Sequence, residues 1–250
     1  MRCIYCKRDS GPNPGIAHIF PEALHANEEV LPRGTVCDNC NQYFGKRLDE
    51  NLIRYPSIAL AIQFLATPGK SGKPRKLIGG IEREIPGEPD ALFRTFTDKP
   101  TIVSGTDGSQ GARVQFKQDP QFRMARFRRA LHHVAFNIVA KLENADHMML
   151  PHWDLARQYI RFPTGESESW SFAQITPSPV SIPRVVQGIR WESGRRELVN
   201  MQIFQSMFVV DLRNTGDLEA LAREQDAEYY GPERNDPPPV TLDLSADDSP

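Results

Sequence analysis

The amino-acid sequence predicts an α+β protein in which a small cysteine-rich N-terminal module precedes a larger domain with antiparallel strands around one long helix. Three observations carry this prediction. All four cysteines lie within the first 40 of the 250 residues. Residues 121–143 place apolar side chains at helical period, and segments typical of strands lie on both sides of them. Strands and helices in this mixed order favour antiparallel pairing in a sheet.

The cysteines form two pairs, Cys3 with Cys6 and Cys37 with Cys40, and two residues separate the members of each pair. Such pairs can supply four thiolates to one tetrahedral Zn²⁺. The 30 residues between the pairs exceed the usual gap of roughly 15–20 residues. The longer loop adds under about 0.6 kcal/mol of closure entropy, whereas structural zinc contributes about 10–16 kcal/mol in comparable peptides. A zinc site is therefore expected, and four unmetallated thiols or a redox pair are the alternatives.

The helices follow from periodicity and from proline. A helix is expected to begin near the second cysteine pair, and Pro56 should end or bend it before a second, mostly buried helix in SIALAIQFLA. Within residues 121–143, one apolar stripe runs along the helix; its members are Phe127, Leu131, Val134, Ile138 and Leu142. The expected strands are ALFRTF (91–96), ARVQF (112–116), WSFAQI (170–175), VSIPRVVQGIRW (180–191) and LVNMQIFQSMFVVDL (198–212).

Composition divides the chain into four parts. The predicted division is a zinc-binding module at 1–55, a helix with a basic Gly/Pro-rich linker at 56–80, an α+β domain of unknown role at 81–230, and an acidic, proline-rich, disordered tail at 231–250.

The formal net charge of −2 combines two halves of opposite sign, because residues 1–200 have a balance of +6 and residues 201–250 a balance of −8. A mildly basic body is compatible with a nucleic-acid partner, although a solvated surface is the commoner explanation. No apolar run approaches the ~20 residues that a membrane span needs. The N-terminal MRCIYCKRDS has no apolar region of a secretory signal, so a cytoplasmic location without membrane contact is expected.

Three stretches, CIYC, HIFPEAL and VCDNCNQYFG, resemble the HNH endonuclease family in its branch with a four-cysteine zinc site. The resemblance covers about residues 1–50. It implies a ββα-metal core, in which two short strands and a helix hold one divalent cation. In such enzymes the motif histidine takes a proton from the water that attacks a phosphodiester, and the cation stabilises the charged transition state.

Carried onto this chain, the resemblance assigns the general base to His18 and the helix position of a metal ligand to Asn41. A structural Zn²⁺ and a catalytic Mg²⁺ or other divalent ion are the implied metals. Asn41 could instead cap the first turn of its own helix. The alternative for His18 is a packed or hydrogen-bonded residue of an alternating strand.

This sequence departs from the family pattern at two places. Ala17 stands where the family has a metal-binding Asp, Glu or His, and a proline stands where its central asparagine is expected. Glu22, His25 and Asn27 are the candidates that could supply the missing donor atoms. Mg²⁺ requires oxygen ligands, one or two of them carboxylates, so the absence of a donor at position 17 is the more serious departure.

A second candidate site lies on the long helix, where Arg126, Arg129 and His133 are spaced three and four residues apart, away from the apolar stripe. Such a face can contact phosphates without reading base sequence, and a solvated helix face is the alternative. The sequence thus predicts a metal-dependent endonuclease acting on nucleic acid, with DNA favoured. The competing prediction is a catalytically inactive, zinc-stabilised module that binds nucleic acid or another partner. The larger domain could bind substrate, a protein partner or a ligand.

Overall fold

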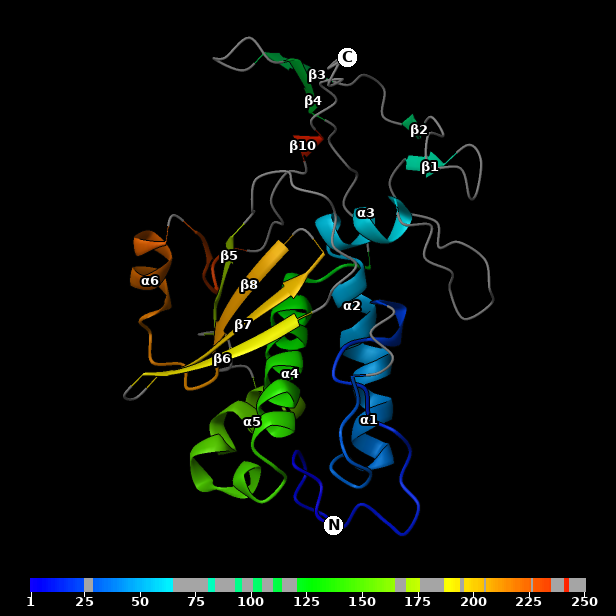
Figure 1. Ribbon diagram of the computed structural model, residues 1–250, viewed down its shortest axis with the longest axis vertical. Helices are drawn as coiled ribbons and strands as arrows, with labels where there is room; N and C mark the ends of the chain where they lie inside the picture. The colour runs from blue at the N-terminus through cyan, green and yellow to red at the C-terminus, as the bar shows by residue number, and fades with distance from the viewer. Residues whose placement is uncertain are drawn as a thin grey trace.

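The computed structural model describes most of the N-terminal module and of the second half of the chain (Figure 1). The described residues are 1–24, 29–64, 81–83, 93–95, 101–104, 110–113, 121–164, 170–175, 187–193, 196–204, 206–225, 227–234 and 241–242. The helices are α1 (Asp38–Phe44), α2 (Glu50–Ile53), α3 (Pro56–Phe64), α4 (Met124–Leu142), α5 (Asp154–Arg161) and α6 (Leu218–Glu224), with short turns η1 (Glu22–Leu24), η2 (Gly45–Asp49), η3 (His147–Met149) and η4 (Pro151–Trp153). The strands are β1 (Ile81–Arg83), β2 (Phe93–Thr95), β3 (Thr101–Ser104), β4 (Gln110–Arg113), β5 (Phe172–Ile175), β6 (Gln187–Ser193), β7 (Arg196–Ile203), β8 (Ser206–Asp211), β9 (Glu228–Tyr230) and β10 (Thr241–Leu242). The predicted α+β class is confirmed.

The N-terminal module has the order extended segment, extended segment, helix. His18 forms an antiparallel bridge with Val30. On either side of this bridge, Ile19 N donates to Glu29 O at 2.8 Å and Leu31 N donates to Ala17 O at 2.9 Å. α1 follows within the same module, so two short paired segments and a helix lie together, as the resemblance implied.

The expected helix after the second cysteine pair is present, and it runs through three consecutive pieces. α1 passes into η2, which is π-helical, and then into α2 without leaving helical backbone angles. The chain turns at Arg54 and Tyr55, and α3 begins at Pro56. Proline is tolerated in the first turn because the amide hydrogen that it lacks has no helical acceptor there. The prediction that Pro56 separates two helices is confirmed.

α4 is the central element of the described structure. The predicted helix at 121–143 is confirmed, and Phe127, Leu131, Val134 and Ile138 of its stripe are buried, whereas Leu142 at its end is 59% exposed. Burial extends well beyond one stripe, because α2 and η2 contact α4 on one side while α5 and the strands β6, β7 and β8 contact it elsewhere. α4 is therefore enclosed between the N-terminal helices and the sheet (Figure 1).

The main sheet has five antiparallel strands in the order β6-β7-β8-β5-β9. The segment 198–212, predicted as one strand signal, is a hairpin: β7 and β8 pair from Leu198 with Asp211 to Ile203 with Ser206. Phe204 at this turn has φ of 53°, in the left-handed region that reverses a chain tightly. One face of the sheet contacts α4, and the other carries α6 (Figure 1).

One apolar core joins the beginning of the chain to its end. It runs from Cys3 and Tyr5 through Phe127 to Tyr230, and the N-terminal module shares it with α4 and the sheet. Two small sheets, β1-β2 and β10-β4-β3, lie outside this core region. β10 falls inside the segment predicted to be disordered, and its pairing with β4 gives that segment at least one ordered contact. Among the described helices, none combines the length and the apolar character that crossing a membrane requires.

Candidate functional site

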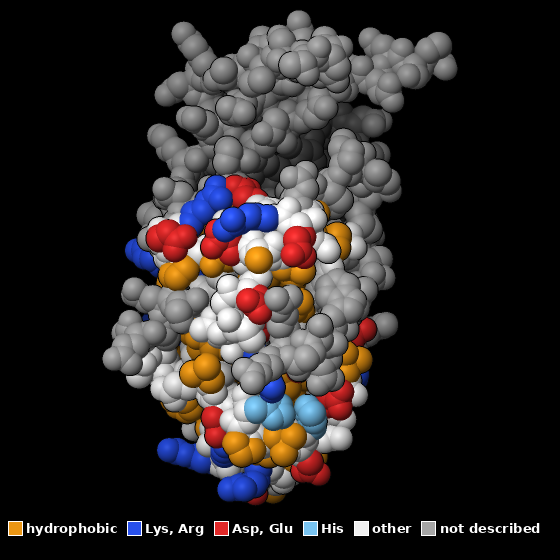
Figure 2. Space-filling model, turned by 90° about the vertical axis from the view of Figure 1, so that its left-hand side faces the viewer, with side chains coloured by type: hydrophobic (Ala, Val, Ile, Leu, Met, Phe, Trp, Pro, Cys, Tyr) orange, Lys and Arg blue, Asp and Glu red, His pale blue; other side chains and the backbone are white. Residues whose placement is uncertain are grey.

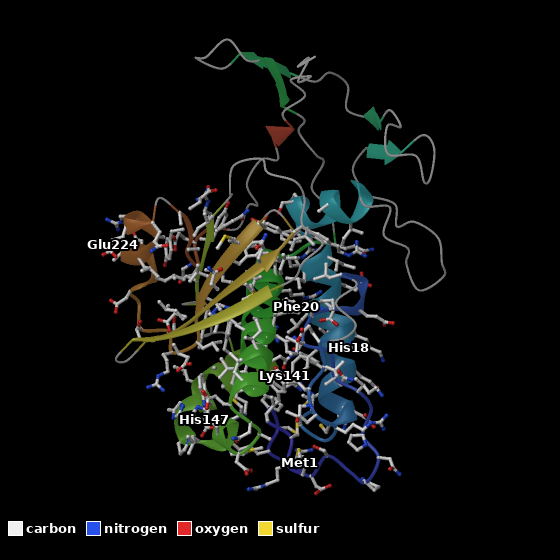
Figure 3. The ribbon with its side chains drawn as sticks, viewed as in Figure 1. Met1, His18, Phe20, Lys141, His147 and Glu224 are labelled. Carbon is white, nitrogen blue, oxygen red and sulfur yellow. The ribbon has the colours of Figure 1, made fainter. Side chains whose placement is uncertain are left out.

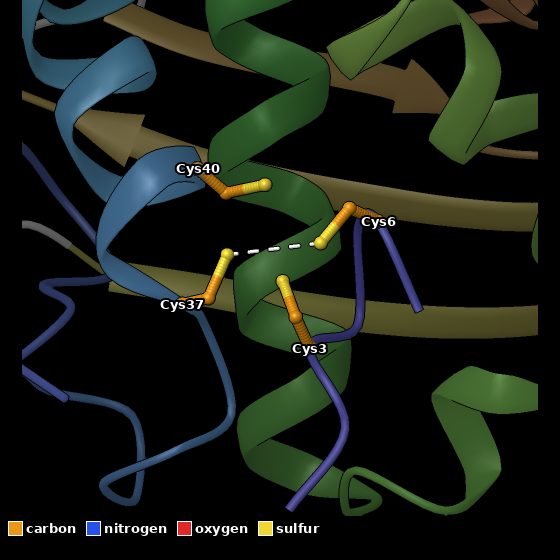
Figure 4. Close-up of side chains that lie close together, drawn as sticks. All are labelled: Cys3, Cys6, Cys37 and Cys40. Carbon is orange, nitrogen blue, oxygen red and sulfur yellow. Dashed lines mark hydrogen bonds between the residues drawn. The ribbon is translucent and has the colours of Figure 1, made fainter. Parts of the chain in front are cut away.

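The four cysteines converge on one point (Figure 4). Their Sγ atoms all lie within 4.8 Å of one another, and the Cys6 and Cys37 sulfurs are 3.7 Å apart. Four thiolates at about 2.3 Å from a tetrahedral Zn²⁺ would lie about 3.8 Å apart, whereas a disulfide requires about 2.05 Å. The cysteines are thus positioned to bind one metal ion, and their geometry is consistent with structural zinc.

Local backbone geometry builds this cluster from two knuckles. In the first, Lys7 adopts φ of 58° and its N–H donates to Cys3 O at 2.9 Å, which folds the chain back over the two sulfurs. In the second, Cys37 is the N-cap of α1 and Cys40 follows in the first turn. A CxxC at a helix start directs both sulfurs to the same side, since the second cysteine lies almost one turn after the first.

The electrostatics of the cluster favour a cation at its centre. The Cys40 thiol donates to Cys3 and lowers the pKa of Cys3 to about 4, whereas burial raises the pKa of Cys37. Several thiolates this close repel one another unless a metal ion compensates them. Arg161 Nε donates to Cys40 Sγ at 3.4 Å and supplies part of that compensation from α5.

His18 lies on the paired segment next to α1, and Lys141 lies on the neighbouring α4 (Figure 3). The His18 ring is partly buried, and its Nδ1 is enclosed without a hydrogen-bond partner among the described residues. The backbone around it is fixed from α4: Asn137 Nδ2 contacts His18 O at 3.4 Å, and Lys141 Nζ donates to Val30 O at 2.9 Å. The histidine thus lies on a backbone that the paired segment and α4 hold in place.

Asn41 connects α1 to the segment that carries His18. Its side-chain Nδ2 donates to Ile16 O at 3.0 Å. The N-cap of α1 is Cys37, and no side chain caps it, so the alternative in which Asn41 caps its own helix is wrong. Because the amide nitrogen of Asn41 donates to Ile16 O, its amide oxygen points away from that carbonyl oxygen.

Sequence reasoning missed the position of Asp38. Gly15 N donates to Asp38 Oδ1 at 2.8 Å, and a Cβ on Gly15 would lie only 3.2 Å from that oxygen. Asp38 and Asn41 are three residues apart and therefore share a face of α1. The start of α1 presents one carboxylate and one amide to the segment that leads into His18. An acidic residue in the first turn next to Asn41 was the signal available in the sequence.

Of the three residues proposed to supply the donor atom that position 17 lacks, the structure describes only one. Ala17 is 5% exposed and belongs to the apolar core. Glu22 is exposed on η1, and His25 and Asn27 lie outside the described residues. Within the described part of the chain, the four cysteines are the one group of three or more His, Cys, Asp or Glu whose ligand atoms are within reach of one metal.

The predicted basic face of α4 divides into three different environments. Arg126 is exposed, whereas Arg129 is half-buried and donates to Tyr43 Oη at 2.6 Å and to Ile160 O at 2.8 Å. His133 is 6% exposed and stacks on Phe44 with 4.0 Å between ring centroids. Burial lowers the pKa of His133 to about 3, so the ring is neutral. The prediction that His133 contacts nucleic acid is wrong, because the N-terminal module covers this side of the helix.

Comparison with known proteins locates the family signal in the same segment. Residues 3–57 match the family model described as HNH endonuclease. No curated protein and no solved structure matches the chain significantly. The matched segment contains all four cysteines, His18 and Asn41, and it ends just after Pro56. Residues 3–57 therefore form an HNH endonuclease-like module. The match confirms the resemblance that CIYC, HIFPEAL and VCDNCNQYFG indicated.

Proposed function

We propose that the protein is an HNH-type endonuclease that hydrolyses phosphodiester bonds of nucleic acid, with His18 as the general base. The observation that carries the proposal is the placement of His18 on the paired segment beside the start of α1, with the Asn41 side chain bonded two residues away at Ile16 O. A neutral imidazole can accept a proton from the attacking water.

Asp38 and Asn41 are the described residues that would hold a catalytic divalent ion, together with water and the substrate phosphate. One carboxylate and one amide oxygen suit Mg²⁺, which usually keeps several waters and one or two carboxylates. Such an ion, when bound, would stabilise the negative charge that develops on the phosphate. The protein itself contributes the fixed backbone at His18 and the orientation of Asn41 through Ile16 O.

Exposed cations near the module would position the phosphate backbone. Lys46 and Arg47 are exposed on η2, directly after α1, and Lys141 is exposed beside Val30. Contacts of this kind fix the register of a nucleic acid without reading its bases. They favour nucleic acid as the substrate class, and DNA remains the favoured form. Arg126 is the member of the earlier predicted face that is exposed and could extend this surface.

The test is a cleavage assay with supercoiled plasmid, single-stranded DNA and RNA, each with Mg²⁺, Mn²⁺ or Ni²⁺. His18→Ala should abolish cleavage, and Asp38→Asn should weaken it most at low metal concentration. His152→Ala is the matched control, because His152 is exposed on η4, outside the HNH endonuclease-like module. Full activity in His18→Ala would refute the assignment of the base.

A second function is supported by Ala17. Its burial in the core leaves position 17 without a ligand, and a module that has lost its metal site could still bind nucleic acid. That function predicts no cleavage with any of the three metals, together with binding that weakens as salt increases. The plasmid assay and a salt titration of binding distinguish the two functions.

A further inference from the structure

A stack of one arginine and two aromatic rings lies beside the cysteine cluster, where α1, α4 and α5 meet. The guanidinium of Arg161 lies over the Tyr43 ring at 4.0 Å and over the Phe162 ring at 4.8 Å. Arg161 Nε donates to Cys40 Sγ, and the Tyr43 hydroxyl accepts from Arg129 of α4 at 2.6 Å. Three helices therefore hold two arginines and two aromatic rings in one cluster.

Phe162 is the exposed end of this stack. The residue follows the last turn of α5 and is 43% exposed. Its backbone is fixed, because its N–H donates to Gln158 O at 2.8 Å and its carbonyl accepts from Gln158 Nε2 at 2.6 Å. A phenylalanine held at the surface in this way presents an apolar ring to solvent instead of burying it in the core. A ligand with a flat π face would cover that ring.

The arginines around the stack lack acidic partners. Arg161 and Arg129 form no ion pair with any described carboxylate. Arg47 follows Tyr43 by four residues, and Arg126 precedes Arg129 by one turn of α4; both are exposed, and neither is paired within the described part of the chain. Unpaired arginines this close together attract phosphates, and they do so without reading base sequence.

A different charge pattern is found on the side of the molecule where α6 lies. Figure 2 views that side and shows acidic and basic side chains interspersed on its described part. In α6 itself, Glu219 and Arg223 pair one turn apart. Such a mixed surface produces no field of one sign. The unpaired arginines near α1, α4 and α5 are therefore a local feature of that junction.

Helix geometry places this junction next to the candidate nuclease site. Tyr43 and Asn41 are two positions apart on α1, so their side chains leave opposite flanks of the helix. Gln42 is exposed on the side between them, and the exposed Lys46 follows it one turn later. The distance across the helix is about 10–12 Å. A short single strand that stacks on Phe162 can thus cross α1 and reach its Asn41 flank, where the candidate catalytic residues lie.

We propose that this junction is a stacking surface for single-stranded nucleic acid, with one unpaired base against Phe162 and the neighbouring phosphates on its arginines. The stacking surface comprises Tyr43, Arg47, Arg126, Arg129, Arg161 and Phe162. The proposal rests on the proposed nuclease function and names its substrate as a single-stranded segment beside the cleavage site. Every base has a π face, so stacking of this kind tolerates any sequence, whereas the bases of a duplex already stack on one another.

The experiment measures binding to the full-length, zinc-loaded protein by fluorescence anisotropy, without added Mg²⁺ so that cleavage does not interfere. The probes are a labelled DNA single strand of about 12 nucleotides, the duplex of the same sequence, and a polyglutamate peptide of the same charge as the single strand. The single strand should bind most tightly. Phe162→Leu should weaken its binding about tenfold, because the variant loses the π face but stays apolar, and should leave duplex binding unchanged.

Matched variants separate stacking from charge. Phe162→Trp keeps a π face and should bind the single strand as tightly as the wild type. Leu150→Ala is the control, because Leu150 is also 43% exposed but lies between η3 and η4, outside the stacking surface. Arg126→Gln should weaken binding and lower the slope of log K against log salt by about 0.7, the value for one phosphate contact on a single strand. Phe162→Leu should leave that slope unchanged.

Three results would overturn the proposal: Phe162→Leu binds the single strand as the wild type does, it loses affinity for the duplex by the same factor, or polyglutamate binds as tightly as the single strand. The last result would indicate an acidic protein partner instead. Failure of the proposed nuclease function looks different. In that case no metal supports cleavage, or His18→Ala cleaves like the wild type, while the single strand still binds and Phe162→Leu still weakens its binding.

Discussion

Asn137 of α4 provides a quantitative test of how the HNH endonuclease-like module is attached to the rest of the protein. The residue is 1% exposed, and its Oδ1 accepts from Tyr5 Oη at 2.7 Å. Its Nδ2 lies 3.2 Å from His133 Nε2 and 3.4 Å from His18 O. Tyr5 lies between Cys3 and Cys6, so one buried amide joins the first zinc knuckle, the His18 segment and the central helix.

Asn137→Leu should lower the free energy of unfolding by about 1–3 kcal/mol, because the buried Tyr5 hydroxyl loses its short acceptor. The hydroxyl keeps only a 3.4 Å contact with His133 O, and burial raises the pKa of Tyr5 so that it stays protonated and needs an acceptor. Tyr5→Phe should cost a similar amount because it leaves Asn137 Oδ1 without its donor. The double variant removes both groups and should cost less than the sum of the two single variants, by about 1–2 kcal/mol.

The assay is urea unfolding of the zinc-loaded wild type, both single variants and the double variant, followed by tryptophan fluorescence. The coupling is refuted if the loss of unfolding free energy in the double variant equals the sum of the losses in the two single variants to within about 0.5 kcal/mol. Cleavage rates supply a second readout. Asn137→Leu removes the contact with His18 O and should slow cleavage, whereas Tyr5→Phe keeps that contact and serves as the control of comparable stability.

Three further predictions concern other parts of the structure. Cys40→Ser should reduce the zinc content well below one ion per chain and lower the melting temperature, because structural zinc contributes on the order of 10 kcal/mol. Ala17→Glu should destabilise the protein by at least about 2 kcal/mol without increasing cleavage, since it places a carboxylate in the apolar core. Burial lowers the pKa of His132 to about 4, and the unfolded value is near 6.5, so acid should favour the unfolded chain from pH 6.5 downward.

The measurements for these predictions are direct. Metal analysis after gel filtration and thermal unfolding test Cys40→Ser, and an unchanged melting temperature would contradict a structural role for the metal. Urea unfolding with the plasmid assay tests Ala17→Glu, which fails as a prediction if the variant is both stable and more active. For His132, the free energy of unfolding should fall by up to about 3 kcal/mol between pH 6.5 and 4, and His132→Phe should remove that part of the decline. If the free energy of unfolding of His132→Phe falls between pH 6.5 and 4 as steeply as that of the wild type, His132 is not the cause of the decline.

The parts of the structure that the sequence predicted depend on local patterns. The spacing of Cys3, Cys6, Cys37 and Cys40 is a local requirement of one tetrahedral ion, and the four sulfurs do converge. Helical period and the chemistry of Pro56 likewise act within one or two turns, so α1, α3 and α4 were predicted close to their observed positions, whereas the shorter α5 and α6 were not predicted. Patterns of this kind can be recognised without information about the rest of the chain.

The parts that were missed depend on contacts between distant segments. His133 was predicted to be exposed because it lies off the apolar stripe, but Tyr5 and Phe44 cover it from the N-terminal module. The sequence near position 133 contains no pattern that indicates packing against residues more than 80 positions away.

Position 17 shows how a local sequence pattern and the contacts between distant segments combine. In the paired segment, Ala17 and Ile19 are buried, while Ile16 is 45% exposed and His18 is partly exposed, as strand alternation requires. A ligand at position 17 would therefore have to leave the core side of the strand to reach a metal near His18. The start of α1 needs no such rearrangement, because Asp38 and Asn41 already contact the backbone at Gly15 and Ile16. If this module is catalytic, its carboxylate comes from the helix, and Asp38→Asn should impair cleavage in a way that a donor restored at position 17 does not repair.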